Sequence, residues 1–183
     1  AAALPPLEGD LEVPGLRAPV EVLRDRWGVP YLSAGSLEDL WFAQGFVTAS
    51  ERLFQIDLAL RAAAGRLSEL FAELTLADDR FARVIGFRRI GAREAERWSD
   101  TSRAMVGRFV EGAQAWIASM PAPPVEYALL AMPPELPEDL GSWAAAFAYA
   151  AWGLSGNWDV ELLRVHLAER FGPQAVGELL PPL

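Results

Sequence analysis

The amino-acid sequence predicts a mainly α-helical protein with one short β-hairpin near its amino terminus. Apolar residues recur every three or four positions through long stretches of the chain, which is the spacing of amphipathic helices. Two short runs before residue 35 instead have the composition of strands, with a turn between them. A chain of 183 residues, 52% of them hydrophobic, is long enough for one compact domain over residues 1–183 with a sizeable core.

The start of the chain is expected to hold a lead-in followed by the hairpin. Residues 1–17 are rich in proline, glycine and acidic side chains, which favours an extended lead-in. Residues 19–24 alternate apolar and polar side chains, as a half-buried strand does. Residues 25–28 supply turn chemistry, and 29–34 form the second predicted strand, with Pro30 near its start or on an edge.

A long helix is predicted after the hairpin. Ser36 suits its N-cap, because a serine hydroxyl accepts a hydrogen bond from an N–H group of the first turn, and acidic residues follow it. Residues 40–60 carry enough apolar side chains for a helix buried on most sides. Gly65 ends this helix, and residues 67–74 are expected to form a shorter one.

A second long amphipathic helix is predicted from a cap at residues 100–102 through Met120, because its apolar residues lie three to four positions apart. A proline-rich connector follows over residues 121–137. We expect the large apolar residues of the connector to be packed against other parts of the protein: Tyr127, Leu129 and Leu130.

Three further helices are predicted towards the end of the chain. An alanine-rich helix opens after Pro137 and runs to Leu154. It is too short to span a bilayer, which takes about 18 or more apolar residues in a row, so no membrane span is expected and the helix is predicted to be buried, either inside this chain or against a partner. Residues 158–170 form the next helix, before Gly172, and a short last helix ends at Leu180.

The composition excludes several classes of function. A net charge of −9 argues against nucleic-acid binding, which needs a basic face that displaces counterions. The arginines between residues 80 and 89 have acidic neighbours, Asp78 and Asp79 among them, so we expect a mixed, solvated surface there. The absence of cysteine excludes disulfides, thiolate catalysis and zinc–thiolate sites, but leaves the cellular compartment open.

The residues alone predict no self-contained catalytic machinery. No serine lies in a Gly-x-Ser-x-Gly turn, which would present a nucleophile. The single histidine, His166, is expected on the surface or in helix packing. No phosphate-binding glycine-rich loop follows a predicted strand, so no organic cofactor is expected.

Calcium is the metal that the composition leaves open, because it takes oxygen ligands. One histidine without cysteine excludes most transition-metal sites. Asp78 with Asp79, or Asn157 with Asp159, offer suitable oxygen atoms, although solvated side chains are the simpler interpretation of both pairs.

Three stretches of sequence resemble the α-chain of the penicillin acylase (penicillin amidase) family of N-terminal-nucleophile hydrolases. Residues 22–34 match an Arg-Asp, Gly-x-Pro pattern, with Tyr31 where the family usually has histidine. Residues 42–57, FAQGFVTASERLFQID, are the most specific match and continue into GRLSELF at 65–71. The third stretch, LSGNWDVELL, occupies residues 154–163.

The resemblance implies that this chain is the α-subunit of a two-chain αββα hydrolase. An exported precursor, periplasmic or secreted, would be cut into this chain, a spacer and a larger β-chain, and residues 180–183 would be close to the spacer cut. The first residue of the β-chain, a serine, would be the nucleophile and its α-amine the base, so no catalytic residue is expected in this chain. Residues 1–183 would form one intertwined body with the β-chain.

The substrate class implied is a small N-acylated amide, such as a penicillin or a related compound. An acyl-homoserine lactone or a lipopeptide is the alternative within the family. A non-catalytic helical binding module, which uses its tryptophan-rich face on a partner, is the alternative from a different class.

The resemblance also implies positions for two sites. The family lines its acyl pocket with the C-terminal part of the alanine-rich helix, which corresponds here to Ala150, Gly153 and Leu154, with Phe147 and Trp152 as further candidates. A structural calcium ion shared between the chains would use Asn157, where the family has an acidic ligand. An amide oxygen can bind calcium but carries no charge.

Overall fold

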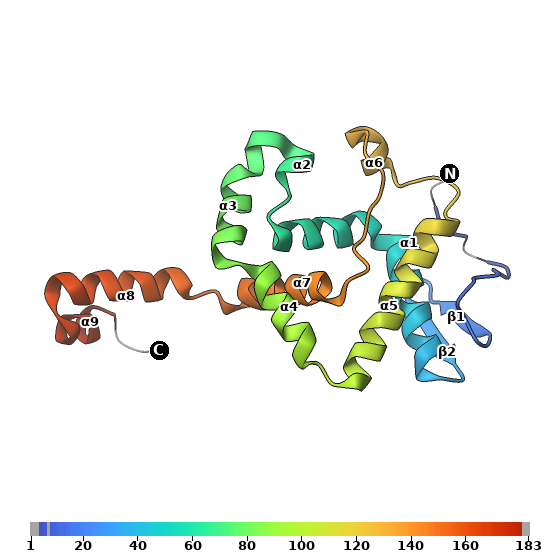
Figure 1. Ribbon diagram of the computed structural model, residues 1–183, viewed down its shortest axis with the longest axis horizontal. Helices are drawn as coiled ribbons and strands as arrows, with labels where there is room; N and C mark the ends of the chain where they lie inside the picture. Colours follow the sequence, from blue (N-terminus) through green and yellow to red (C-terminus); the bar gives the residue numbers. More distant parts are fainter. Residues whose placement is uncertain (1–3, 7, 181–183) are drawn as a thin grey trace. The chain divides into compact units, whose positions relative to one another are not determined.

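A computed structural model of the protein describes residues 4–6 and 8–180, and it confirms the predicted fold class, mainly α-helical with an N-terminal hairpin (Figure 1). No helix among these residues is long and apolar enough to cross a membrane. The chain packs into two compact units, Ala1–Ala148 and Tyr149–Leu183, each described by itself below. The elements, in chain order, are β1 Val20–Arg24, β2 Pro30–Ala34, α1 Leu37–Ala64, α2 Ser68–Phe71, the 3₁₀ helix η1 Ala72–Thr75, α3 Leu76–Ile85, α4 Phe87–Arg97, α5 Asp100–Ser119, α6 Val125–Leu130, α7 Leu140–Ser155, α8 Trp158–Phe171 and α9 Pro173–Leu179.

The hairpin forms as predicted. β1 and β2 pair antiparallel, from Val20 opposite Ala34 to Arg24 opposite Pro30. Asp25 builds the turn, because its carboxylate accepts hydrogen bonds from the N–H groups of Trp27 (2.8 Å) and Val29 (2.9 Å). The described part of the lead-in, residues 4–6 and 8–17, contains no helix or strand, as expected.

Helix α1 has the predicted ends. The Ser36 hydroxyl accepts from the Asp39 N–H at 3.1 Å and so caps the first turn. Gly65 ends the helix with φ 66°, a left-handed conformation that glycine adopts without steric cost. A kink at Arg52 (φ −134°, ψ 25°) divides the helix, which the sequence analysis did not predict.

The core of the first unit lies where α1 crosses α5, and the two helices lie side by side (Figure 1). Glycines make the close crossing possible. A Cβ on Gly45 would overlap the Phe109 carbonyl oxygen, and a Cβ on Gly112 would overlap that of Phe42. Buried residues from α1, α5, α6, α7 and the connector form one cluster: Ala49, Leu53, Leu60, Val110, Ala113, Trp116, Tyr127, Leu136 and Trp143.

The proline-rich connector contains a short helix, α6, that the sequence analysis did not predict. Tyr127 is only 1% exposed, as expected for a packed residue, but Leu129 is 81% exposed, so that part of the prediction was wrong. Helix α6 has only six residues, and one of its sides faces away from the core. Side-chain hydrogen bonds hold the end of the connector, from Gln114 to the Leu136 carbonyl (2.7 Å) and from Trp143 to the Pro137 carbonyl (2.8 Å).

The observed helices differ from prediction in three further ways. Residues 68–75 form α2 and η1 rather than one helix, and α3 and α4 follow, which were not predicted. The N-cap of α5 is Ser99, whose hydroxyl accepts from the Ser102 N–H at 3.1 Å, rather than a residue of 100–102. A serine that precedes an acidic first turn satisfies the same orphan N–H groups one position earlier.

The second unit consists of the end of α7 with α8 and α9. Helices α8 and α9 contact each other, and Val176 of α9 is buried. The rings of Tyr149 and Trp152 lie 5.7 Å apart, and those of Trp152 and Trp158 lie 6.5 Å apart. Helix α8 ends before Gly172, as predicted.

Candidate functional site

Helix α7, on which the acyl-pocket residues were predicted, is buried at its start and exposed at its end. Trp143, Ala144 and Ala145 are at most 5% exposed. Beyond them Phe147 is 54% exposed and Leu154 is 89% exposed. The alanine-rich helix is therefore buried in this chain only over its first half.

The predicted pocket residues fall on both sides of the boundary between the units. Phe147 belongs to the first unit, where its ring lies 6.3 Å from that of Trp98. Ala150, Gly153 and Leu154 are exposed, and their spacing places them on one side of α7. Trp152 is half-buried in the aromatic group with Tyr149 and Trp158. No further observation bears on their predicted role, which stays a prediction.

Asn157, the predicted calcium ligand, is exposed and directly precedes α8. Its backbone carbonyl accepts the Glu161 N–H at 3.0 Å, and its side chain makes no capping hydrogen bond. In the part of the chain that the structure describes, no group of three His, Cys, Asp or Glu side chains is placed to hold a metal ion. Asn157 therefore offers one amide oxygen, to which other ligands would have to be added.

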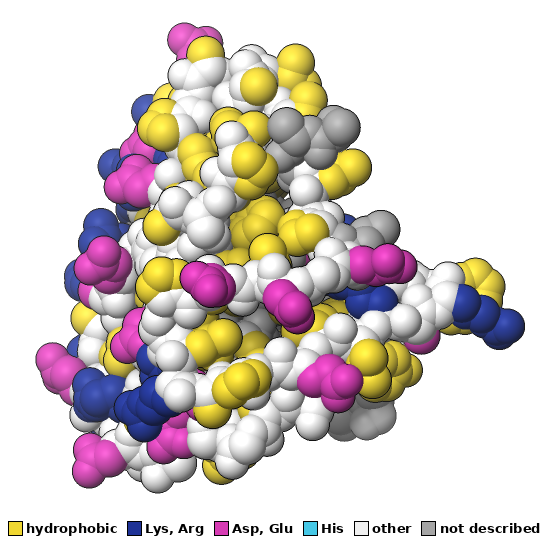
Figure 2. Space-filling view, turned by 90° about the vertical axis from the view of Figure 1, so that its right-hand side faces the viewer, with side chains coloured by type: hydrophobic (Ala, Val, Ile, Leu, Met, Phe, Trp, Pro, Cys, Tyr) yellow, Lys and Arg dark blue, Asp and Glu magenta, His cyan; other side chains and the backbone are white. Residues whose placement is uncertain are grey.

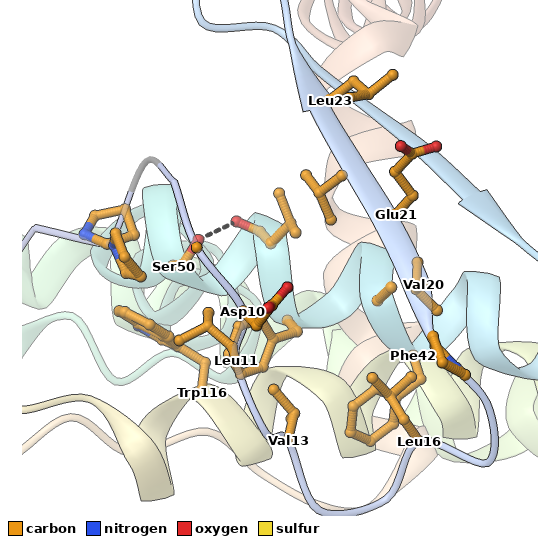
Figure 3. Close-up of a pocket in the computed structure, with 18 of the residues that line it drawn as sticks. Asp10, Leu11, Val13, Leu16, Val20, Glu21, Leu23, Phe42, Ser50 and Trp116 are labelled. Atoms are coloured by element: carbon orange, nitrogen blue, oxygen red, sulfur yellow. Dashed lines mark hydrogen bonds between the residues drawn. The ribbon is translucent and has the colours of Figure 1, made fainter.

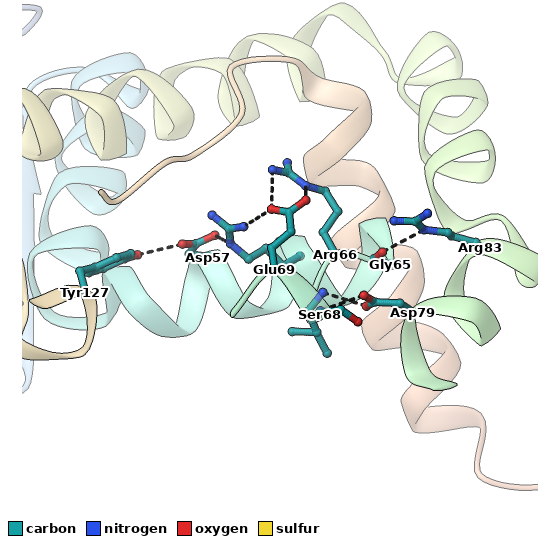
Figure 4. Close-up of polar contacts among 10 residues, drawn as sticks. Asp57, Gly65, Arg66, Ser68, Glu69, Asp79, Arg83 and Tyr127 are labelled. Carbon is teal, nitrogen blue, oxygen red and sulfur yellow. Dashed lines mark hydrogen bonds and ion pairs between the residues drawn. The ribbon is translucent and has the colours of Figure 1, made fainter. Parts of the chain in front are cut away.

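A partly buried group of polar residues links α1, α2 and α6 (Figure 4). We call its members the α1 charge network: Asp57, Arg61, Arg66, Glu69 and Tyr127. Asp57 and Arg61 are 2% and 4% exposed and are joined by a 2.6 Å ion pair. Glu69 binds both arginines, Arg61 at 2.6 Å and Arg66 at 2.7 Å. The Tyr127 hydroxyl donates to Asp57 at 3.2 Å.

The electrostatics of this network suit a structural role. Burial raises the pKa of Asp57, and the hydrogen bonds of Arg61 and Tyr127 offset part of that rise. Burial and the Asp57 carboxylate raise the pKa of Tyr127, so the phenol stays protonated as a donor. The Arg66 hydrogen bond lowers the pKa of Glu69. Asp57, Arg61 and Tyr127 are buried, so this part of the network ties α1 to α6 inside the protein, while Arg66 and Glu69 lie nearer the surface.

The prediction that Asp79 is a solvated acid was wrong. It is 4% exposed, and its carboxylate accepts from the N–H groups of Leu67 and Ser68, each at 2.8 Å (Figure 4). It therefore satisfies the N–H groups at the start of α2, which no local side chain caps. Beside it, Arg83 donates to the Gly65 carbonyl at 2.9 Å.

The first unit also contains a cavity of about 740 Å³, which we call the lead-in cavity (Figure 3). The lead-in borders it on one side and β1 on another. Phe42, Phe46 and Val47 of α1 and Trp116 of α5 are apolar parts of its lining. Hydrophobic side chains show at the bottom of a hollow on this side of the molecule, with acidic side chains beside it (Figure 2). Neither the cavity nor the α1 charge network was predicted from the sequence.

His166, the single histidine, is exposed on α8, which agrees with the predicted surface position and not with the alternative, a position in helix packing. Ser36 and Ser99 cap helices, and Ser50 and Ser119 donate to backbone carbonyls of their own helices. Among the described residues, this chain thus offers an exposed apolar surface and a cavity.

Comparison with known proteins places the chain in a family. The sequence profile described as penicillin amidase matches residues 19–183. The chain is 41% identical over 134 residues to penicillin acylase 2 proenzyme of Pseudomonas sp. (strain SE83), covering 73% of this chain and 17% of that protein. It is 30% identical over 184 residues to acyl-homoserine lactone acylase QuiP of Pseudomonas aeruginosa, covering 99% of this chain and 21% of that protein. The chain thus spans only a minor part of the curated relatives it matches.

The structure is similar to thermostable penicillin G acylase from Alcaligenes faecalis, with a TM-score of 0.68 and 25% sequence identity. The match covers 88% of this chain and 91% of that chain. The likeness therefore extends over almost the whole of both chains.

Proposed function

The chain belongs to the penicillin amidase family, and we propose that it is the smaller, non-nucleophile subunit of an amidohydrolase that cleaves the side-chain amide of N-acylated small molecules, penicillins or related compounds. The observation that carries the proposal is the family match over residues 19–183. The structural likeness supports it, because it reaches 91% of one chain of a penicillin G acylase.

In this proposal the reaction takes place on a larger β-chain from the same precursor. An acyl transfer needs a nucleophile, a base and oxyanion donors in one place. The β-chain would supply an N-terminal serine, with its own α-amine as base. The name of one relative, a proenzyme, supports a precursor of this kind.

The contribution of this chain would be a wall of the acyl pocket, built from the end of α7. Ala150, Gly153 and Leu154 would face the acyl group, with Phe147 and Trp152 beside it. Small apolar side chains leave room for an acyl chain and discriminate by volume and fit. Their exposure in this chain is consistent with a pocket that a second chain completes.

Exposed apolar side chains support a second chain. In the second unit, Leu154 is 89% exposed, Leu179 60%, Phe171 58% and Val165 52%. Apolar surface of this kind marks an interaction site, and permanent complexes cover large apolar interfaces.

The remaining parts of the proposal follow the family resemblance. The precursor would be exported, and the mature protein would be periplasmic or secreted. One structural calcium ion would bind between the chains, with Asn157 as a ligand from this side. No organic cofactor takes part in the proposed chemistry.

An acyl-homoserine lactone is the second candidate substrate, because relatives with that activity in their names match 96–99% of this chain over alignments of 180–190 residues. The two substrate classes share the amide bond and an apolar acyl chain, so one pocket of this type suits both.

The test uses the product of the whole gene. It is expressed as a precursor, and its chains are identified by N-terminal sequencing. Amide hydrolysis is then measured with phenylacetyl, hexanoyl and octanoyl amides and with the corresponding N-acyl-homoserine lactones. The proposal expects two chains, with serine at the start of the larger one, and loss of all hydrolysis when that serine is replaced by alanine. A gene that stops directly after residue 183, or a protein without amidase activity, would favour the non-catalytic binding module.

A further inference from the structure

The lead-in cavity has the boundaries of a slot for one more β-strand. All five residues of β1, Val20–Arg24, line it, and among its described lining residues none comes from β2. Side chains alternate between the two faces of a strand, so a cavity that meets five consecutive residues lies along the edge of β1 and not over one face. Figure 3 shows β1 and the lead-in on opposite sides of the cavity.

The lead-in has the pattern of a strand but no strand partner. From Glu8 to Val13 it alternates acidic residues with Gly9, Leu11 and Val13, which is the period of a strand with one apolar face. In the described part of the chain, its one backbone–backbone hydrogen bond is the 3.5 Å bond that the Val13 carbonyl accepts from Leu16. Residues 8 and 9 form a bend, with Gly9 at φ 108°, and residues 10–13 belong to no helix, strand or turn. The unpaired N–H and C=O groups of residues 10–13 are a template for another strand.

The floor of the cavity is suited to the side chains of such a strand. Phe42, Phe46 and Val47 lie on one face of α1, and Trp116 joins them from α5. The Phe46 and Trp116 rings are packed edge to face at 5.4 Å, so the floor is a fixed apolar surface. A strand laid across it would bury every second side chain.

The slot is held open at one end. The Arg17 N–H donates to the buried carboxylate of Asp39 at 2.9 Å, and Arg108 donates to the Gly15 carbonyl at 2.8 Å. The Arg17 hydrogen bond lowers the pKa of Asp39, so the anchor stays ionised at neutral pH. These contacts fix the lead-in to α1 and α5 directly before β1 begins.

We propose that a β-strand from the larger chain occupies the lead-in cavity, pairing with residues 10–13 on one side and with the edge of β1 on the other. This inference rests on the proposed function, since it takes the occupant from the same precursor. The relatives have ample sequence for it, because this chain covers only 17% and 21% of two of them. The result is a four-stranded sheet over α1, in which the two edges now open to solvent are paired.

The chemistry of the slot specifies the occupant. Its inward side chains are apolar and medium-sized, because they meet Phe42, Phe46 and Trp116. Its outward side chains next to the lead-in are basic or hydroxylated, because the exposed acids Asp10 and Glu12 are their cross-strand neighbours.

The experiment uses the assembled two-chain protein. A photo-crosslinking amino acid replaces Leu11 in one variant and Val22 in another, so that each probe stands on one side of the slot. A third variant carries it at Leu74, which is 88% exposed in η1 and serves as the control. After irradiation, crosslinked peptides are identified by mass spectrometry, and backbone amide exchange is measured over residues 8–13 and 20–24.

The proposal expects both slot probes to label the same short peptide of the larger chain, and the Leu74 probe to miss that peptide. It also expects alternate amides of residues 10–13 to exchange at least tenfold more slowly than free peptide. Crosslinks from Leu11 to β1 itself, or amides of residues 10–13 that exchange as in free peptide while α1 stays protected, would overturn it. Amide hydrolysis by the same samples is assayed in parallel. An active enzyme with an empty slot contradicts this inference alone, whereas a protein without a second chain contradicts the proposed function as well.

Discussion

Asp79 stabilises the start of α2 through the ionised form of its carboxyl group. Burial alone would raise its pKa, but hydrogen bonds from Ser68 and from the Leu67 N–H hold that pKa below its ordinary value. A carboxyl group with a lowered pKa in the folded state binds fewer protons than in the unfolded state, so its contribution to stability is present above the unfolded pKa and is lost as the pH falls. The acid part of the stability profile should therefore depend on this residue.

We predict that Asp79→Asn flattens that profile. Between pH 6 and pH 3 the melting temperature of the two-chain protein should fall less in this variant than in the wild type, because the carboxylate that takes up a proton is gone. At pH 6 the variant should melt at a lower temperature, since an amide is a weaker acceptor for two N–H groups. Asp78→Asn, at the exposed neighbour, is the matched control and should follow the wild type; equal profiles for both variants would contradict the role assigned to Asp79.

Asn157 leads to a prediction about calcium. Its amide oxygen carries no charge, so it attracts the ion less than a carboxylate in the same place. Exhaustive chelation of the assembled protein should lower its melting temperature by only a few degrees, and Asn157→Asp should raise calcium affinity in a titration with the ion. A large loss of melting temperature on chelation that Asn157→Ala abolishes would show that the neutral ligand holds the ion strongly.

The sequence indicated some of these residues and missed others for a physical reason. Ser36 and Gly65 act through their own neighbours in the chain, so local chemistry was enough to assign them. Asp57, Asp79 and Tyr127 depend on partners that the fold brings from other elements, which a single sequence does not display. The same holds for Leu129, whose exposure depends on which side of α6 faces the core.

The crossing of α1 and α5 is the element-scale contact on which the first unit depends, and glycines set its distance. We predict that Gly112→Ala destabilises the protein by about 1–3 kcal/mol or more, because the added Cβ overlaps the Phe42 carbonyl oxygen and the helices must separate. Gly107→Ala, on the same helix with open space around it, is the control. It should leave stability unchanged or raise it by up to about 1 kcal/mol, because alanine restricts the unfolded chain.

Denaturation of both glycine variants, followed by tryptophan fluorescence of the assembled protein, gives the comparison. If Gly112→Ala were as stable as Gly107→Ala, the close approach of the two helices would not be needed for the fold.

Helix α7 carries the prediction on substrate choice. If Leu154 stands in the acyl pocket, the larger ring of Leu154→Phe shortens the space for the acyl chain. The preferred substrate should then shift from octanoyl towards hexanoyl amides, at roughly 1–3 kcal/mol per methylene in kcat/KM. The comparison of hexanoyl, octanoyl, phenylacetyl and glutaryl amides decides the point. A wild-type preference for the glutaryl substrate would contradict an apolar pocket.

At the scale of elements, prediction succeeded where a helix carries its own start and stop signals and failed where it does not. Helices α1, α5, α7 and α8 were expected close to their observed bounds. Helices α3 and α4 were missed because they are rich in charge, with an apolar side that shows only when the rest of the unit is packed against it. The kink at Arg52 was not predictable, because neither a proline nor a glycine lies at that position.

On the scale of the whole molecule, the chain leaves much apolar surface exposed. The most exposed large apolar residues include Leu154 at 89%, Leu74 at 88%, Leu129 at 81% and Val84 at 78%. They occur in both units, so the unpaired surface is not confined to one end of the sequence. A composition of 52% hydrophobic residues predicts an excess of apolar surface. Which apolar residues are exposed depends on packing, so their positions were not predictable from the sequence.

This surface leads to the last prediction, that residues 1–183 expressed alone are poorly soluble or partly unfolded. An obligate subunit has apolar surface that only its partner covers, and without the partner that surface drives self-association. The chain alone should elute as large or mixed species in size-exclusion chromatography and should melt without a cooperative transition in circular dichroism. Expression together with the rest of the gene product should give a soluble, cooperatively melting complex of the same chain. A monodisperse monomer of residues 1–183 with a sharp melt would show that the exposed apolar surface needs no second chain, and would favour the binding module over the subunit.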